Sequence, residues 1–390
     1  MIPFIDLQSQ YKRIASGVEE RVLKAMRGGQ YILGPEVGEL ERALAAFTGS
    51  RHCISCASGT DALLMALMAQ GIGPGDAVFC PTFTFIATAE VVALLGATPV
   101  FVDIDLDTYN IDPAALEAAV DAILTGVGST HAVPRDQTGK PVTGLTPRAI
   151  IAVDLFGLPA NYAALHAVAQ RHDLLVIEDA AQGYGGLQHG RRAGSLAPVG
   201  CTSFFPAKPL GCFGDGGALF TDDDELANQF KSIRVHGQGE TRYEHVRLGI
   251  TGRLDSIQAA VLLEKLAIFA DELDARDRAA KQYSERIATR GLDLITPKVP
   301  EGSRSAWAQY CLLARDGAHR DACQASLKAA GVPTMIYYPL PLHLQPTFAG
   351  LGYRAGDFPL SEDAARRIFA IPMHPYLEDA RICSIVDGLV

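Results

Sequence analysis

The chain is predicted to be an α/β protein, with a large domain built on a mostly parallel sheet and a smaller C-terminal α+β domain. Between residues 50 and 235, short apolar runs alternate with stretches of helical periodicity. Strands separated by helices of this length favour a parallel sheet covered on both faces. A long helical stretch from Asp255 to Ala288 then connects to a smaller unit that begins at about residue 290. The 390 residues suffice for two such domains, with predicted limits 1–255 and 256–390.

The individual elements are predicted from the period of the apolar residues and from their turn signals. The strands of the large domain are expected at His52–Ala57, Ala77–Cys80, Pro99–Val102, Ala149–Val153, Leu174–Ile177, Cys201–Phe205 and Gly217–Phe220. The helices between and after them are expected at Asp61–Gln70, Ala87–Leu95, Ala114–Val120, Tyr162–Arg171 and Glu225–Val235. The smaller domain should contain a strand at Ala308–Ala314 and a helix at His319–Ala330.

Two further segments are placed by composition. A helix over about Gln10 to Arg27 is expected to pack on the smaller domain or on a partner. Residues 125–147 are rich in Gly, Thr and Pro, which predicts an exposed loop or hairpin inserted before a core strand.

Composition excludes several classes of function. The formal net charge is -10 and the basic residues are dispersed, which argues against a nucleic-acid binder. The N-terminus lacks the pattern of a signal peptide, and no run of about 18 apolar residues could span a bilayer, so we expect a cytoplasmic protein. The eight cysteines lack the spacing of a zinc site and are expected to be buried thiols, so no metal is predicted.

A carboxylate ends one of the predicted strands. In Val176-Ile177-Glu178-Asp179, the acid Asp179 falls at the carboxyl edge of the sheet, where ligands bind in such folds. Its burial there is expensive unless it meets a cation, such as the protonated ring nitrogen of pyridoxal phosphate. Taken alone, an Asp at a strand end also fits a helix cap or a turn.

A lysine follows another predicted strand. Lys208 lies between Pro206 and Pro209, which stiffen its backbone, five residues after Ser203. Partial loss of hydration would lower the pKa of such a lysine and suit it to Schiff-base formation. Ser203 offers a hydroxyl to a phosphate, whereas a loop lysine considered alone is more often an ordinary surface residue.

The remaining parts of a cofactor site also follow strands. In Ser58-Gly59-Thr60-Asp61 a strand leads through a glycine into a helix, whose free amides and dipole form a phosphate site. Plain helix capping by Ser58 or Thr60 is the alternative. Phe85 follows the next strand and is either an aromatic that stacks on a flat cofactor or a core residue.

In this order the motifs resemble those of the fold type I pyridoxal-phosphate enzymes and, more narrowly, the DegT/StrS family of sugar aminotransferases. The matching stretches are Gly29–Val37, Ser58–Leu63, Glu178–Gln182, Ser203–Gly217 and Arg253–Ala260. The resemblance covers essentially the whole chain apart from residues 125–147. It implies an aminotransferase that uses pyridoxal 5'-phosphate and transfers an amino group from an amino acid, expected to be glutamate, to a nucleotide-linked keto sugar.

The resemblance also implies roles for single residues. Lys208 forms the internal aldimine and moves the proton, and Asp179 pairs with the pyridine nitrogen. Further cofactor contacts are implied for Ser58, Gly59, Thr60, Ser203, Phe85 and Gln182, of which Gln182 bonds the ring hydroxyl. Members of the family complete each site across a homodimer, here through Thr251 and Arg253. The family's pattern has Asn at the position of Thr251, so a shorter contact from Thr251 or backbone amides are expected to replace it.

The substrate is expected from the closest branch of the resemblance. Residues 30–37 and 208–217 look most similar to enzymes that make 3-amino sugars on uridine diphosphate for surface polysaccharides such as lipopolysaccharide O-antigen. A 3-keto hexuronate needs a cation for its carboxylate, and Arg253 supplies a bidentate partner, although a structural ion pair is the alternative. Further substrate contacts are expected from Tyr31, Tyr337, Tyr338 and His374.

Three alternatives to this function are considered. A 4-keto nucleotide sugar is the first alternative substrate. A related dehydratase carries His at the lysine position, and Lys208 argues against it. A regulatory protein that retains the fold is the alternative from another class, against which the acidic charge and the missing helix-turn-helix both speak.

Overall fold

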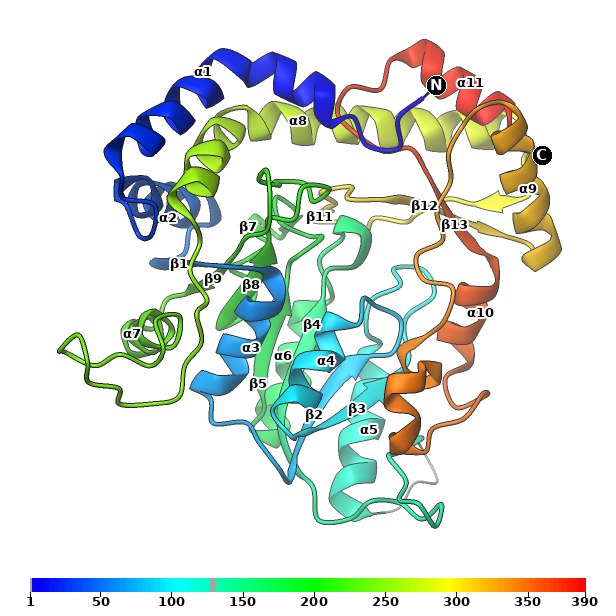
Figure 1. Cartoon of the computed structure of the whole chain (residues 1–390). Coiled ribbons are helices and arrows are strands. Elements are labelled where there is room, and N and C mark those ends of the chain that lie inside the picture. Colours follow the sequence, from blue (N-terminus) through cyan, green and yellow to red (C-terminus); the bar gives the residue numbers. More distant parts are fainter. Residues whose placement is uncertain (1, 127–130) are drawn as a thin grey trace.

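A computed structural model describes residues 2–126 and 131–390. Figure 1 shows a central sheet flanked by helices, with the long helix α8 (Ser256–Thr289) lying across one end of the molecule beside α1 (Leu7–Gly28). The large sheet has seven strands in the order β1 (His52–Cys56), β9 (Gly217–Thr221), β8 (Val199–Ser203), β5 (Leu175–Asp179), β4 (Thr146–Val153), β2 (Asp76–Pro81), β3 (Thr98–Val102). Only β9 runs against its neighbours among these described strands, so the prediction of a mostly parallel sheet is confirmed.

Helices cover both faces of this sheet because successive strand residues point to opposite sides. On one face, Val78 and Ile151 belong to the core formed with α3 (Gly59–Ala69), α4 (Ala87–Leu94) and α7 (Asp224–Ile233). On the other face, their neighbours Phe79 and Ile150 pack with α5 (Pro113–Thr125) and α6 (Tyr162–His172). The alternation fixes the register of each strand. Because most of the strands are parallel, their carboxyl ends, and the polar residues there, lie at one edge of the sheet.

The C-terminal part forms a second core. Its antiparallel sheet has the order β10 (Leu294–Ile295), β12 (Tyr310–Ala314), β13 (Ile368–Ile371), packed with α8, α9 (Gly317–Ala329) and α11 (Asp379–Asp387). The helix α10 (Pro359–Arg367) lies between this sheet and the large domain. A third sheet, β11 (Ser303–Arg304), β6 (Leu187–Gln188), β7 (Arg191–Arg192), joins the two parts of the chain.

One segment returns from the C-terminal part to the large domain. Residues 342–358, with the short helices η2 (Leu342–Leu344) and η3 (Pro346–Leu351), bury Phe348 and Phe358 in the core beside β2 and α3. His343 fastens the segment through Nδ1, which lies 2.8 Å from the Thr82 hydroxyl. The limits 1–255 and 256–390 therefore remain a prediction about the chain, since residues after 256 contribute to both cores.

The N-terminal segment packs on the long helix. Ile14 and Val18 of α1 form a small apolar cluster with Val261 of α8, and Gln10 Nε2 donates to the Glu272 carboxylate at 2.9 Å. The helix α2 (Pro35–Thr48) begins with a proline in its first turn, where the missing amide costs nothing, and packs on α8 and β1.

The inserted segment is a partly exposed hairpin in the residues that the structure describes. Arg135 and Pro141 form an isolated bridge around a turn at Gly139 before β4 begins at Thr146. Residues 127–130 of the predicted insert lie outside the described residues. All eight cysteines are free thiols; seven are buried and Cys383 is half-buried. Within the described ranges, no helix has both the length and the apolar character needed to cross a membrane.

Candidate active site

Several predicted site residues meet at one edge of the large sheet. The register pairs Cys56 with Gly217 and Gly217 with Ser203, and it sets Asp179 opposite Cys201. The ends of β1, β5 and β8 and the start of β9 therefore lie side by side (Figure 1). This is the carboxyl edge of the parallel strands, where ligands of such sheets bind.

Asp179 is a buried carboxylate held by two donors. The Ala181 amide donates to Oδ1 at 3.1 Å, and the Thr88 hydroxyl donates to Oδ2 at 3.1 Å. Burial raises the pKa of Asp179, and the Ala181 amide, the charge of Lys208 and the Thr88 hydroxyl partly offset that rise. Asp179 takes part in no ion pair among the described residues, so its charge is left for a cation brought by a ligand.

Lys208 lies in the loop between β8 and β9. Its backbone amide donates to the Phe205 carbonyl at 2.9 Å, which closes a turn that contains Pro206. Burial lowers the pKa of the Lys208 amine, and the negative charge of Asp179 partly opposes this effect. A lysine with a lowered pKa has a larger neutral fraction near pH 7, which is the form that attacks carbonyl carbon and accepts protons.

The first turn of α3 offers donors to an anion. Ser58 caps the helix with its hydroxyl, which accepts from the Asp61 amide at 3.0 Å. The Gly59 and Thr60 amides have no acceptor within the described part of the chain, as expected at a helix N-terminus. Ser203 lies against this turn, since a Cβ on Gly59 would stand 3.3 Å from Ser203 Oγ. The structure is therefore consistent with both interpretations of the motif: Ser58 caps the helix, and the next two amides are free to bind a phosphate.

Gln182, three residues after Asp179, contacts Tyr338, which in turn packs against Phe85. Gln182 is buried, and its Oε1 accepts from the Phe156 amide at 2.7 Å while its Nε2 donates to the Tyr338 hydroxyl at 3.0 Å. The ring of Phe85 is 53% exposed, and its centroid lies 6.4 Å from that of Tyr338. Phe85 is thus no core residue in the chain, and its open face suits a flat ligand.

Thr251 and Arg253 lie together at a neighbouring hollow. Arg253 Nη2 donates to Thr251 Oγ1 at 2.7 Å, and His236 Nε2 lies 3.1 Å from the same oxygen. The hollow, of about 460 Å³, is lined by Ile32, Ala57, Gly214, Asp215, Thr251, Arg253, Asp255 and Gln258. Because Ala57 directly precedes Ser58, the hollow adjoins the anion-binding turn. Tyr31, exposed with its hydroxyl on the Met26 carbonyl, precedes the lining residue Ile32.

Of the other predicted substrate residues, one lies near the site and one lies away from it. Tyr337 is half-buried beside Tyr338, at the edge of the group around Gln182. His374 is buried elsewhere: burial and the charge of Arg276 together lower its pKa to about 4, with Asp6 partly opposing them. Its neighbours belong to α8 and the N-terminal segment, so the structure does not bring His374 together with Lys208 and Asp179.

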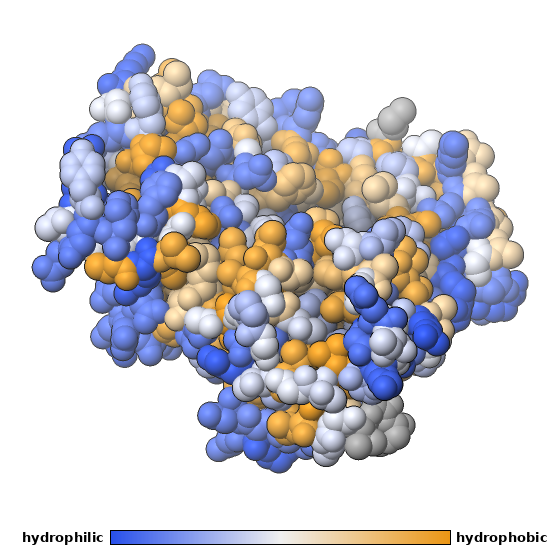
Figure 2. Space-filling model, turned by 60° about the horizontal axis from the view of Figure 1, so that its bottom comes forward, coloured by the Kyte–Doolittle hydropathy of each residue, from blue (hydrophilic) through white to orange (hydrophobic). Residues whose placement is uncertain are grey.

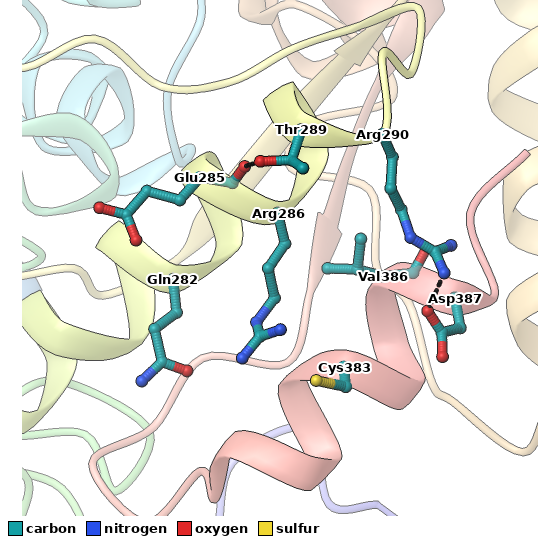
Figure 3. A pocket seen from close by; sticks show the side chains of 8 residues that line it. All are labelled: Gln282, Glu285, Arg286, Thr289, Arg290, Cys383, Val386 and Asp387. Carbon is teal, nitrogen blue, oxygen red and sulfur yellow. Dashed lines mark hydrogen bonds and ion pairs between the residues drawn. The ribbon is translucent and has the colours of Figure 1, made fainter.

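A different cavity lies between α8 and α11 (Figure 3). It has a volume of about 480 Å³ and is lined by Gln282, Glu285, Arg286, Thr289, Arg290, Cys383, Val386 and Asp387. None of the predicted site residues lines it.

Two residues that contribute to the site were not predicted from the sequence. Thr88 lies three residues after Phe85 in the first turn of α4, and only the fold turns its hydroxyl toward Asp179. Phe156 contributes through its backbone amide, which no side-chain pattern reveals.

The residues present fit pyridoxal 5'-phosphate. A buried acid that forms no ion pair with the residues described suits the ring nitrogen, free amides at a helix start suit the phosphate, and a lysine of lowered pKa suits the aldehyde. The turn at Ser58 and Gly59 is also tightly packed, because a Cβ at Gly217 would lie 2.4 Å from the Ser58 carbonyl oxygen. Among the described residues no cluster could hold a metal ion. Fold and site together define a fold type I pyridoxal-phosphate-dependent transferase.

The chain belongs to the DegT/DnrJ/EryC1/StrS aminotransferase family, whose model matches residues 12–390. Aminotransferases of this family depend on pyridoxal 5'-phosphate. The chain is similar to UDP-2-acetamido-2-deoxy-3-oxo-D-glucuronate aminotransferase of Pseudomonas aeruginosa, with 47% identity over 100% of this chain and 99% of that protein. It is also 42% identical to a pleiotropic regulatory protein of Geobacillus stearothermophilus, over 100% and 97% of the two chains. The crystal structure of a DegT DnrJ EryC1 StrS aminotransferase from Brucella abortus matches with a TM-score of 0.92 and 49% identity, covering 100% of this chain and 98% of that one.

Proposed function

We propose that this aminotransferase moves an amino group from an amino acid, expected to be glutamate, to carbon 3 of a UDP-linked 3-keto N-acetylhexosaminuronate. The similarity to the Pseudomonas aeruginosa enzyme, which acts on such a sugar, extends over the full length of both chains. The single observation that supports the catalytic part of the proposal is that Lys208 is desolvated and close enough to the buried Asp179 for the two charges to interact. The product fits the synthesis of surface polysaccharides.

The protein residues have separate tasks in this proposal. Pyridoxal phosphate supplies a ring that withdraws electrons from the reacting carbon. Asp179 keeps a proton on the ring nitrogen, because a negative charge in a buried site favours the protonated ring. Lys208 Nζ takes a proton from the carbon of the amino donor and returns one during the transfer to the sugar. The Gly59 and Thr60 amides and the Ser203 hydroxyl hold the phosphate, while Ser58 keeps the helix start in place.

Arg253 is the proposed partner of the sugar's carboxylate. Its guanidinium can pair with a carboxylate through two parallel hydrogen bonds, and in the structure it contacts a hydroxyl group instead of an acid. No carboxylate partner of Arg253 occurs in the part of the chain that the structure describes, which weakens the alternative of a structural ion pair. Tyr31, Tyr337 and Tyr338 remain proposed contacts of the sugar, and His374 has the weakest support because it is buried away from this group.

We further propose a homodimer in which each site is completed by Thr251 and Arg253 of the neighbouring copy. The segments beside the site carry large apolar side chains that are 40–52% exposed, namely Tyr31, Ile32, Leu33, Phe205 and Phe213. Figure 2 shows apolar residues gathered over the middle of one face of the molecule. An exposed apolar surface of this kind is typical of an interface.

A nucleotide-linked substrate and eight free thiols fit a reduced compartment, so we propose the cytoplasm as the location.

A regulatory role is the second candidate, because one similar protein carries a regulatory name. A protein that only kept the fold would have no need of a lysine of lowered pKa beside a buried acid. We therefore favour catalysis over a purely regulatory role.

The proposal is tested with the purified chain, pyridoxal phosphate, glutamate and the 3-keto uronate sugar. Mass spectrometry should detect the 3-amino sugar and 2-oxoglutarate in equal amounts. Lys208→Ala should lose nearly all turnover while remaining folded, whereas the exposed Lys140→Ala serves as the matched control and should keep it. Equal activity of both variants would reject Lys208 as the reacting lysine, and absence of any amine transfer by the wild type would favour the regulatory role.

A further inference from the structure

The amide group of Gln182 is fixed at both ends. A backbone N–H can only donate, so the Phe156 amide at 2.7 Å determines that Oε1 faces it and Nε2 faces the opposite way. On that opposite side the Tyr338 hydroxyl accepts one of the two Nε2 hydrogens at 3.0 Å. Since Gln182 is 4% exposed, water has little access to compete for either bond. One N–H of the amide remains as a donor.

Phe156 holds an unusual backbone conformation at this contact. Its φ is 59°, a region that L-residues other than Asn and Asp rarely adopt. A strained conformation persists only where its surroundings enforce it, and such residues gather at functional sites. Phe156 lies in the short helix η1 (Leu155–Gly157), and in this conformation its backbone amide points toward Gln182.

Residues from the C-terminal part hold this turn in place. The Ala306 amide donates to the Gly157 carbonyl at 2.8 Å, and the Gln309 amide donates to the Phe156 carbonyl at 3.3 Å. A Cβ at Gly157 would lie 2.5 Å from the Trp307 nitrogen, so the two backbones meet closely. Tyr338 also comes from the C-terminal part, and its ring packs on Phe83 with centroids 6.2 Å apart. Both constraints on Gln182 therefore depend on residues after 256.

We propose that Tyr338 is a positioning residue of the cofactor site, which together with the Phe156 amide orients Gln182 so that its remaining N–H points to the oxygen of the cofactor ring. The inference rests on the proposed role of Gln182 toward the ring hydroxyl. It assigns Tyr338 a task that exists before any sugar binds, in addition to or in place of the substrate contact expected from the sequence. The smaller domain thereby adjusts the cofactor through one side chain.

The orientation has a measurable consequence. A donated hydrogen bond stabilises negative charge on the ring oxygen and so favours the deprotonated form of the bound chromophore. If Gln182 is free to rotate, that bond weakens, and the pH at which the absorbance of the bound cofactor changes should rise. Loss of one hydrogen bond to a charged oxygen corresponds to a shift of about one pH unit.

The test is a pH titration of the cofactor absorbance in Tyr338→Phe, without amino donor or sugar. We expect the midpoint to rise by about one pH unit relative to the wild type. Tyr337→Phe is the matched control, since it removes the neighbouring hydroxyl, for which no bond to Gln182 is found among the described residues; its midpoint should stay unchanged. Gln182→Glu removes the donor altogether and should raise the midpoint at least as far.

The outcomes separate the inference from the function on which it rests. A wild-type midpoint in folded Tyr338→Phe, or equal shifts in both tyrosine variants, would overturn the positioning role while the cofactor site stands. A role of Tyr338 in sugar binding alone would change KM and leave this titration unmoved, which also counts against the inference. If the wild type shows no cofactor absorbance, the proposed cofactor site itself fails, and the inference fails with it.

Discussion

The side chain of Ser203 occupies the space that a side chain at Gly59 would need. A Cβ built on Gly59 lies 2.6 Å from Ser203 Cβ and 3.2 Å from its Cα. The close approach brings the end of β8 against the first turn of α3, so that a hydroxyl and two free amides face the same space. Glycine is required there by proximity, since its φ lies in the ordinary range.

Gly59→Ala should therefore weaken cofactor binding. The added methyl group forces the helix start and the strand end apart, and overpacking of this kind typically costs about 1–3 kcal/mol, or roughly tenfold to a hundredfold in affinity. Equilibrium titration with pyridoxal phosphate measures the change in Kd. Gly73→Ala is the control, because its Cβ would meet only the Leu95 carbonyl oxygen, at 3.9 Å. Equal affinities for the two variants would show that the phosphate does not bind at this turn.

The charge of Asp179 should set the pH response of Lys208 in the chain without cofactor. Burial lowers the pKa of the Lys208 amine, and the carboxylate of Asp179 counteracts that effect by favouring the protonated form. Asp179→Asn removes the charge with little change in shape, so the Lys208 pKa should fall further. The reaction of Lys208 with formaldehyde and cyanoborohydride, followed by peptide mass spectrometry, reports the neutral fraction at each pH.

The sign of this prediction follows from the neutral form being the reactive one. The reaction midpoint at Lys208 should move to lower pH in Asp179→Asn, while the exposed Lys231 in the same sample should be unaffected. An unchanged midpoint at Lys208 would mean that the two groups do not interact electrostatically.

With the cofactor present, Asp179→Ala should slow proton removal from the amino donor. The phosphate contacts remain, so the cofactor still binds, but the ring nitrogen loses the charge that keeps it protonated. We expect the first half-reaction with glutamate, followed by absorbance, to slow by about a hundredfold or more. Asp179→Asn keeps an oxygen for the Ala181 amide but lacks the charge, and it should be almost as slow. A wild-type rate in either variant would reject the electron-sink role.

Most of the elements could be predicted from sequence because their apolar residues repeat with the period of a strand or a helix. The seven strands of the large sheet and the helix α8 lie within a few residues of their predicted limits. Asp179 and Lys208 could be singled out because a charged residue at or shortly after the end of a buried strand has to be explained by a partner.

Contacts between distant segments could not be predicted from the sequence. The bond between His343 and Thr82 joins residues 261 positions apart and fastens residues 342–358 to the large domain. The orientation of Gln182 depends on a backbone amide, and the lowered pKa of His374 reflects its burial and the charge of Arg276 on α8. None of these relationships leaves a period or a motif in the chain.

The proposed sharing of sites between two copies predicts that inactive variants rescue each other. Lys208→Ala and Arg253→Ala should each be inactive on the uronate when pure. If Arg253 serves the neighbouring site, a hybrid dimer contains one site with both residues intact. At equal mixing, random exchange makes half of the dimers hybrids, so roughly a quarter of the wild-type activity should return. If subunit exchange is demonstrated and no activity returns, each copy works with its own Arg253.

Arg253→Lys should separate a uronate substrate from a neutral sugar. Arginine pairs with a carboxylate through two parallel hydrogen bonds, which the single ammonium of lysine cannot reproduce. Loss of one charge-assisted bond corresponds to about 1.5–3 kcal/mol, so kcat/KM on the UDP-linked 3-keto uronate should fall by roughly tenfold to a hundredfold. A neutral 4-keto nucleotide sugar lacks the carboxylate, and any activity on it should change far less. The UDP-linked 3-keto sugar with a hydroxymethyl group in place of the carboxylate is the sharper control, because only the charged group differs. Equal losses on all three sugars would return Arg253 to a structural role, while activity on the 4-keto sugar alone would reject the carbon 3 uronate and leave the aminotransferase assignment in place.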